Sequence, residues 1–249
     1  METTNWILAP LRVTIRDLRG KEKSVNLDTN ALEVLKYQGS VHGEFEEDSE
    51  AQKTYYEEIS DILKKRLGAS RVLIYHYFFR SRGTPSIEEQ HDDRHNNPIF
   101  YPHVDVAAAK IPSLVEKLLG KEEAERAMQH RFQVINVWRP LGSNPITHKP
   151  LAICDYRSID VDKDVHSFDI LGIGYTGAAY TISPNVKNTH TWYYLSQMRS
   201  DEMFVFKTFD NKPDVAQFAF HTAFTNGNEF TPNVEQKSLD IRCLVFYDE

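Results

Sequence analysis

Beyond residue 130 the chain is a succession of short strand-like runs separated by turn-forming residues. The runs are rich in β-branched and aromatic residues, which favour strands. They are RFQVINVWRPL, PLAICDYRS, THTWYYL, EMFVFKTFD, AQFAFHTAF and KSLDIRCLVFYD. Short strands at such regular spacing predict two packed sheets or a barrel in this half of the chain.

The first half of the chain adds helices to this β-rich part. The segment EDSEAQKTYYEEISDILKKRLGAS is typical of a helix, with Asp48 or Ser49 as its cap and Gly68 at its end. The segment IPSLVEKLLGKEEAERAMQH predicts two short helices, because Pro112 lies near its start and Gly120 interrupts it. Between these segments RVLIYHYFFR predicts a strand.

Composition narrows the class of protein. Hydrophobic residues make up 41% of the 249 residues and charged residues 26%, as in soluble globular proteins. The net charge of −7 argues against a nucleic-acid surface, and no apolar run is long enough to span a membrane. Both cysteines, Cys154 and Cys243, lie in apolar runs, which suits buried free thiols in a reducing compartment. We expect one domain over residues 1–249, located in the cytoplasm; the sequence does not indicate its oligomeric state.

A histidine and an aspartate lie two positions apart in FYPHVDVAAAK, as His103 and Asp105. In a strand, residues two apart project to the same face. One imidazole and one carboxylate on a common face supply two of the three ligands of the facial triad that holds Fe(II) in non-haem oxygenases. The motif alone is a weak signal, so a third ligand must be found.

His221 is the best third ligand among the ten histidines. In QFAFHTAF, alternation places it on a face with alanines, which leave room for a metal, and places the phenylalanines on the other face. His190 shares its face with Trp192 and Tyr194, so we interpret it as a core or substrate-pocket residue.

A rival cluster lies upstream in HDDRH, where His91, Asp93 and His95 have metal-ligand spacing. Its neighbours are charged or polar and offer no apolar shell. We interpret this segment as a solvated loop.

At several segments the chain resembles the fungal AsaB-like hydroxylase/desaturase family, which includes gibberellin desaturase-like and cephamycin methoxylase-related proteins. The matching segments include YYEEISDILKKRLGASRV, HVD, INVWRPL, PLAICD, DEMFVFKTFD, HTAF and KSLDIRCLVF. The resemblance implies a double-stranded β-helix, or jelly roll, in a mainly β α+β chain with N-terminal and inserted helices. It also implies that His103, Asp105 and His221 bind Fe(II), with 2-oxoglutarate and dioxygen as co-substrates.

The sequence departs from the family pattern at the expected anchor for 2-oxoglutarate. Relatives are expected to carry Arg-x-Ser at the start of the final strand, because arginine pairs bidentately with a carboxylate. Here the segment is Gln236-Lys237-Ser238. Arg242 shares the face of Gln236 and Ser238 and could replace the missing charge, or it could be an outer-face arginine paired with Asp240.

Arg139 and Arg131 are further candidates for the anchor. They share one face of the strand RFQVINVWR, and Asn136 and Trp138 lie on the other. The pattern does not rank these arginines.

Three functions are consistent with these features. The first is a 2-oxoglutarate-dependent dioxygenase that hydroxylates, desaturates or cyclises a small natural product in secondary metabolism. The second is an Fe(II) oxidase that takes all electrons from its substrate, which the altered Arg-x-Ser position motivates. The third is a catalytically silent jelly roll that binds a small molecule or a partner subunit; the complete His/Asp/His set argues against it.

Overall fold

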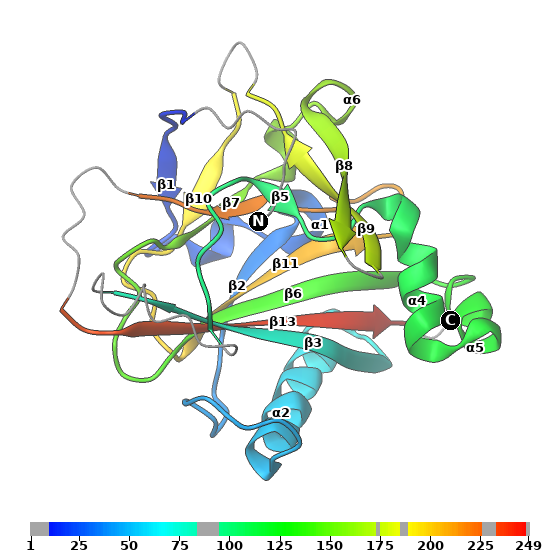
Figure 1. Ribbon diagram of the computed structural model, residues 1–249, viewed down its shortest axis with the longest axis horizontal. Coiled ribbons are helices and arrows are strands. Elements are labelled where there is room, and N and C mark those ends of the chain that lie inside the picture. The colour runs from blue at the N-terminus through cyan, green and yellow to red at the C-terminus, as the bar shows by residue number, and fades with distance from the viewer. Residues whose placement is uncertain (1–9, 84–94, 173–174, 185–188, 226–232, 248–249) are drawn as a thin grey trace.

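Two β-sheets packed face to face form the centre of the protein (Figure 1). The computed structural model describes residues 10–83, 95–172, 175–184, 189–225 and 233–247. In spatial order, one sheet consists of β1 (Ile15–Asp17), β10 (Trp192–Tyr194), β7 (Leu151–Cys154), β12 (His221–Ala223), β5 (His103–Val104), β9 (Tyr175–Ile182) and β8 (Val165–Gly172). The other consists of β2 (Leu32–Lys36), β11 (Glu202–Asp210), β6 (Phe132–Leu141), β13 (Gln236–Phe246), β3 (Arg71–Arg82) and β4 (His95–Asn96). This arrangement is the predicted jelly-roll core.

The central strands of the six-stranded sheet are covered on both faces, and all ten residues of β6 are buried. Alternate residues of β6 serve different layers. Ile135 and Val137 pack toward α2 (Glu50–Leu67), whereas Trp138 packs with Ile153 of the seven-stranded sheet. The inner face of the six-stranded sheet is therefore the one that meets the other sheet.

Helix α2 covers the outer face of the six-stranded sheet (Figure 1). The Ser49 hydroxyl accepts a hydrogen bond from the Gln52 amide at 3.2 Å, and Gly68 ends the helix with a left-handed φ of 71°. Burying Tyr55, Ile59 and their neighbours against the sheet stabilises the helix more than its local sequence does. The helix predicted around residues 49–68 is confirmed.

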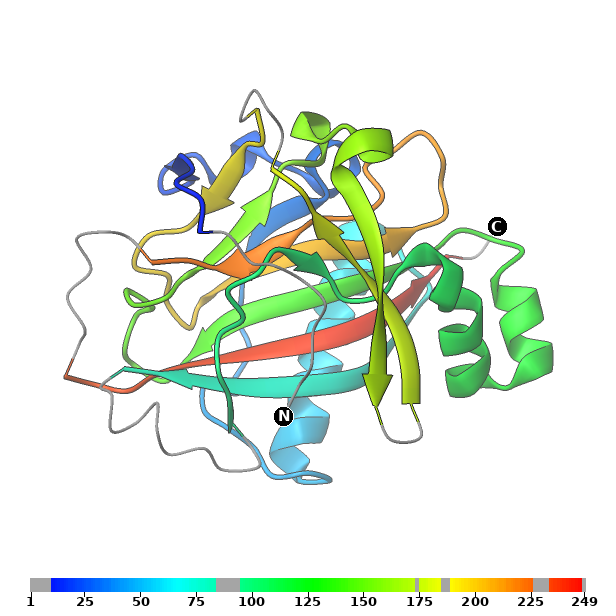
Figure 2. The same cartoon turned by 45° about the horizontal axis from the view of Figure 1, so that its top comes forward.

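Two short helices, α4 (Ile111–Leu119) and α5 (Lys121–Ala127), close one end of the sandwich (Figure 2). Gly120 separates them, as predicted, with φ at 79°. Their apolar residues pack with Phe132 and Leu244 at the ends of β6 and β13. The remaining short helical elements are α1 (Leu27–Asn30), α6 (Val161–Asp164) and the 3-10 turns Glu22–Ser24, Ala108–Lys110 and Tyr156–Ser158.

All six predicted C-terminal runs contain strands, but the hairpin of β8 and β9 was not expected from the sequence. Cys154 and Cys243 are buried free thiols, as predicted. Among the described residues, no helix combines the length and the apolar character needed to cross a membrane.

Candidate metal centre

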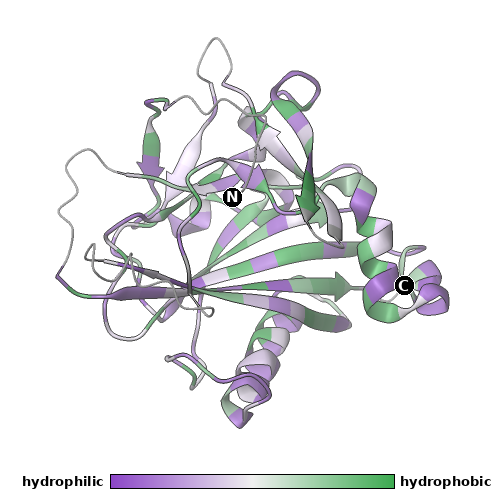
Figure 3. Ribbon diagram, viewed as in Figure 1, coloured by the Kyte–Doolittle hydropathy of each residue, from purple (hydrophilic) through white to green (hydrophobic). Residues whose placement is uncertain are grey.

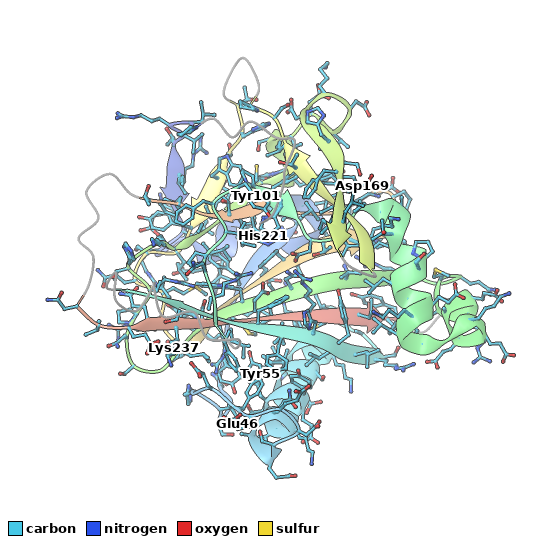
Figure 4. All side chains as sticks on the ribbon, in the orientation of Figure 1. Glu46, Tyr55, Tyr101, Asp169, His221 and Lys237 are labelled. Carbon is cyan, nitrogen blue, oxygen red and sulfur yellow. The ribbon has the colours of Figure 1, made fainter. Side chains whose placement is uncertain are left out.

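Three side chains from two neighbouring strands meet in the interior between the sheets. His103 on β5 and His221 on β12 are direct partners in an antiparallel pair, and Asp105 is the first residue after β5. One ligand atom from each residue lies within 4.8 Å of the other two. The Asp105 carboxylate oxygens lie 3.7 Å from His103 Nε2 and 4.0 Å from His221 Nε2. Figure 4 labels His221 in the region between the two sheets.

Alternation along the segment before and through β12 directs His221 inward. Ala219 contributes to the cluster between the sheets, while Phe218 and Phe220 pack with Trp192 in a separate cluster. The division between an alanine face and a phenylalanine face therefore agrees with the sequence prediction.

Both imidazoles are prepared to act as neutral ligands. His103 Nδ1 lies 2.9 Å from the Tyr101 carbonyl oxygen, so it donates its proton there and leaves the Nε2 lone pair toward Asp105. Burial lowers the pKa of His103, and burial together with His103 lowers the pKa of His221 to about 3. Neither ring needs to lose a proton at neutral pH before it can bind a metal.

Asp105 is held in its ionised form by three kinds of contact. Burial raises the pKa of this carboxyl, but Arg242, the two histidines and Asn136 together hold it well below its usual range. Asn136 Nδ2 donates to Asp105 Oδ2 at 2.6 Å, and the Thr208 hydroxyl donates to Asn136 Oδ1 at 3.0 Å. Arg242 forms an ion pair with Asp105 Oδ1.

The alternative interpretation of Arg242 as an outer-face partner of Asp240 is wrong. Leu239, Ile241 and the next odd-numbered residues of β13 pack in the cluster beneath α2, so the apolar face of this strand is its outer face. The even-numbered residues face the other sheet. In Figure 3, the first part of β13 is largely hydrophilic and its end is hydrophobic. Asp240 lines the same pocket as the histidines, and burial followed by repulsion from Asp105 raises its pKa to about 7.

The structure separates the predicted co-substrate residues. Gln236 is not among the residues that line the pocket; its Oε1 accepts hydrogen bonds from the backbone amides of Thr147 and His148. Arg139 lies on the outer face, where its guanidinium donates to the Ser200 carbonyl and stacks 3.7 Å from the Tyr37 ring centre. It cannot reach the inner face from there.

Arg131, the other unranked arginine, pairs with Asp210 at 2.9 Å and Asp28 at 3.1 Å. Ser238, on the inner face of β13, accepts a hydrogen bond at 2.6 Å from Arg82 Nη2.

Sequence reasoning missed Arg82 and Asn136. Arg82 lies two residues beyond the predicted strand end, and it lines a pocket together with His103, His221, Trp138, Leu151 and Asp240. Strand alternation correctly predicts that Asn136 lies on the face opposite Arg139, but nothing in the neighbouring residues indicates that it contacts Asp105. The available signal was a buried polar residue inside the apolar run INVW.

The competing histidines do not join this cluster. His190 Nε2 lies 2.8 Å from Asp164 Oδ2 and is buried, so the interpretation as a core residue holds. His91 and Asp93 lie outside the described residues, as does the side chain of His95. Across the described part of the chain, His103, Asp105 and His221 form the one group of three side chains spaced to hold a metal ion.

A jelly roll with a buried His/Asp/His cluster defines the class of non-haem iron oxygenases. A family profile described as an oxidoreductase/YMDC permease-like domain matches residues 1–246. The hydroxylase/desaturase efuI of Hormonema carpetanum is 31% identical, covering 95% of this chain and 84% of its own length. The hydroxylase/desaturase CTB9 of Cercospora beticola is 29% identical, covering 95% and 76%.

Solved structures extend this similarity to the fold. The iron and alpha-ketoglutarate-dependent endoperoxidase NvfI matches with a TM-score of 0.84 at 27% identity, covering 100% of this chain and 90% of that one. The corresponding dioxygenase sequence from Aspergillus novofumigatus is 29% identical over 97% of this chain and 84% of its own length. The chain belongs to the family of fungal hydroxylases/desaturases and Fe(II)/2-oxoglutarate-dependent dioxygenases, in agreement with the sequence motifs.

Proposed function

We propose that this protein is an Fe(II)- and 2-oxoglutarate-dependent dioxygenase that oxidises a C–H bond of a small natural product. One domain, residues 1–249, carries the activity, and His103, Asp105 and His221 hold the iron. The observation that supports this most strongly is the buried cluster itself, in which all three ligand atoms lie within 4.8 Å of one another.

The donor set suits Fe(II). Two neutral imidazole nitrogens and one carboxylate oxygen are the ligands of a facial site, which leaves other positions for a co-substrate and dioxygen. The Tyr101 carbonyl fixes the tautomer of His103, and Asn136 orients the Asp105 carboxylate. Such contacts behind the ligands are what a metal centre requires in addition to the ligands themselves.

Bound Fe(II) would supply the activation of dioxygen, coupled to oxidative decarboxylation of 2-oxoglutarate to succinate and CO₂. The protein's own residues position the reactants and exclude water. Trp138 and Leu151 form part of the apolar wall of the pocket, and Phe206 packs 4.8 Å from the His221 ring centre. This wall keeps the metal ligands shielded from bulk solvent.

The reaction on the substrate is proposed to be hydroxylation, desaturation or oxidative cyclisation. The relatives named hydroxylase/desaturase and the endoperoxidase NvfI support an oxidation of this kind on a small molecule. We place the enzyme in the cytoplasm, because its two cysteines are free and buried.

An Fe(II) oxidase that does not use 2-oxoglutarate is the second candidate. It is favoured by the absence of a charge at Gln236, whose side chain is engaged with the backbone at residues 147–148.

Release of labelled CO₂ tests the proposal, with 2-oxoglutarate labelled in the carboxyl group next to its keto carbon. The wild type with Fe(II) and air should release CO₂ and accumulate succinate in equal amounts, whereas Asp105→Ala should do neither. Asp105→Ala removes a metal ligand, so any CO₂ that it still releases measures decarboxylation by free iron. Equal release by the two proteins would contradict the proposal. Substrate oxidation without 2-oxoglutarate would favour the second candidate.

A further inference from the structure

The position expected to anchor 2-oxoglutarate is occupied by a neutral side chain that already has other partners. Gln236 Oε1 accepts from the Thr147 amide at 2.9 Å and the His148 amide at 3.1 Å, and its Nε2 donates to the Thr147 hydroxyl at 2.8 Å. These bonds hold the connection between β6 and β7. Gln236 is 2% exposed, and because its side chain is neutral it cannot form an ion pair with a carboxylate.

An arginine lies directly opposite this glutamine in the same sheet. Arg82, the last residue of β3, is the register partner of Gln236. Its Nη2 donates to the Ser238 hydroxyl at 2.6 Å, and its guanidinium carbon lies 5.7 Å from the centre of the Trp138 ring. The arginine and serine expected on one strand are thus brought together from two adjacent strands.

This pair faces the same pocket as the metal ligands. Arg82 is 1% exposed and lines that pocket together with His103 and His221. A buried guanidinium beside a hydroxyl is suited to binding a carboxylate, since both groups can donate to it.

Arg242 and Arg80, the two other arginines near the metal ligands, have different contacts. Arg242 is paired with Asp105, next to the metal ligands. Arg80 donates to the Asn97 carbonyl at 2.7 Å and is less buried than Arg82. Its burial, its place in the pocket wall and the adjoining Ser238 hydroxyl make Arg82 the best placed of the pocket arginines to bind a distal carboxylate.

We propose that Arg82, held by Ser238, binds the distal carboxylate of 2-oxoglutarate in this protein. The inference rests on the proposed function, and it assigns the anchor to β3 instead of the final strand.

A comparison of two 2-oxo acids isolates this contact. 2-Oxobutyrate has the same chelating end as 2-oxoglutarate but no distal carboxylate. Binding of each acid to the Fe(II)-loaded protein is measured without oxygen from the visible charge-transfer band. Arg82→Gln should weaken 2-oxoglutarate roughly 10- to 100-fold, as for loss of a charge-assisted hydrogen bond, and leave 2-oxobutyrate unchanged. Fe(II) affinity should also be unchanged.

Three further variants keep the test decisive if Arg82→Gln folds poorly. Arg82→Lys keeps the charge but loses the planar fork, so it should weaken 2-oxoglutarate less than the glutamine does. Ser238→Ala keeps Arg82 and should weaken 2-oxoglutarate selectively, by less than Arg82→Gln. The exchange Arg82→Gln/Gln236→Arg should restore part of the lost affinity.

Several outcomes would overturn the inference. Equal weakening of both acids by Arg82→Gln, or of neither, would show that Arg82 does not bind the distal carboxylate. A selective loss in Arg80→Gln instead would move the anchor to Arg80. Absence of a band in the wild type with both acids would overturn the proposed function, and with it the inference, whereas a normal wild-type band with an unaffected Arg82 variant would overturn the inference alone.

Discussion

At the scale of single residues, the centre depends on how Asp105 is held. One of its oxygens is bound by Asn136 and the other by Arg242, and the Nε2 atoms of His103 and His221 lie 3.7 Å and 4.0 Å from the carboxylate. These contacts hold the carboxylate ionised and oriented toward the two histidines. Such preparation lowers the free energy needed to assemble the site when the ion binds.

Asn136→Ala should weaken Fe(II) binding by about 10- to 100-fold, the usual effect of losing a residue that orients a metal ligand. The reason is that Asn136 donates to Asp105 at 2.6 Å and is itself fixed by Thr208. Anaerobic titration with Fe(II) measures the effect. Asn144→Ala is the matched control. The Asn144 side chain donates to the Glu235 carbonyl and makes no contact with the metal ligands, so this variant should bind iron like the wild type.

Arg242→Met should destabilise the metal-free protein by about 3–5 kcal/mol, because it leaves the buried Asp105 charge without its cation. A divalent cation restores that balance. Urea denaturation with EDTA and with Mn²⁺ should therefore show a larger metal-induced stabilisation in the variant than in the wild type. The same metal-induced increase in both proteins would argue against a charge role for Arg242.

At the scale of elements, the two faces of the six-stranded sheet have different roles, because one face stabilises the fold and the other carries residues of the metal site. Its outer face carries the apolar residues that pack under α2, and its inner face carries Asn136, Asp240 and Arg242. The two sets alternate along the same strands. A change on one face should therefore leave the other largely unaffected.

Ile59→Ala on α2 tests this separation. Ile59 is fully buried in the cluster on the outer face, so its truncation should lower the free energy of unfolding by about 2–5 kcal/mol. Fe(II) affinity at a temperature where the variant is folded should not change. Asp61→Ala, on the exposed side of α2, should alter stability by less than about 0.5 kcal/mol. A loss of iron affinity in Ile59→Ala would refute the separation.

The start of β11 provides a pH-dependent contribution to stability. Burial raises the pKa of Glu202, but Arg19, Lys36 and the Arg199 amide outweigh it and lower this pKa to about 2, from 4.5. A carboxylate with a lowered folded-state pKa stabilises the protein above the unfolded pKa, and this contribution is lost as pH falls from about 4.5 toward 2.

Glu202→Gln should therefore cost about 3 kcal/mol at pH 7, and the difference from wild type should shrink steadily below pH 4.5. Urea unfolding at several pH values measures it. A difference that stays constant between pH 7 and pH 3 would show that the ion pairs of Glu202 are not responsible.

At the scale of the whole molecule, alternation and spacing predicted most of the core. They identified the strands of the C-terminal half and α2 with its caps, and they favoured His103, Asp105 and His221 as metal ligands. The strands, the helix and the face on which a strand residue lies follow from local periodicity, which the sequence displays directly. That the three ligands meet was implied by the family resemblance.

What the sequence could not display was which strands would be neighbours. Arg82 follows the aromatic run in the polar segment SRG, so it resembled the start of a turn; pairing with β13 extends the strand through it. The β8–β9 hairpin was missed because most of β8 is exposed and its sequence shows no alternation of apolar and polar residues. The partners of Gln236 and Arg242 likewise come from distant segments.

The central claim is that His103, Asp105 and His221 bind Fe(II) and present it to 2-oxoglutarate. Anaerobic titration of the metal-free protein with Fe(II) and then 2-oxoglutarate, followed by visible absorption, tests it most directly. We predict a charge-transfer band in the wild type and none in His103→Ala at the same concentrations. Iron binding without the band would contradict the use of 2-oxoglutarate, and a band of equal intensity in His103→Ala would contradict the assignment of the metal ligands.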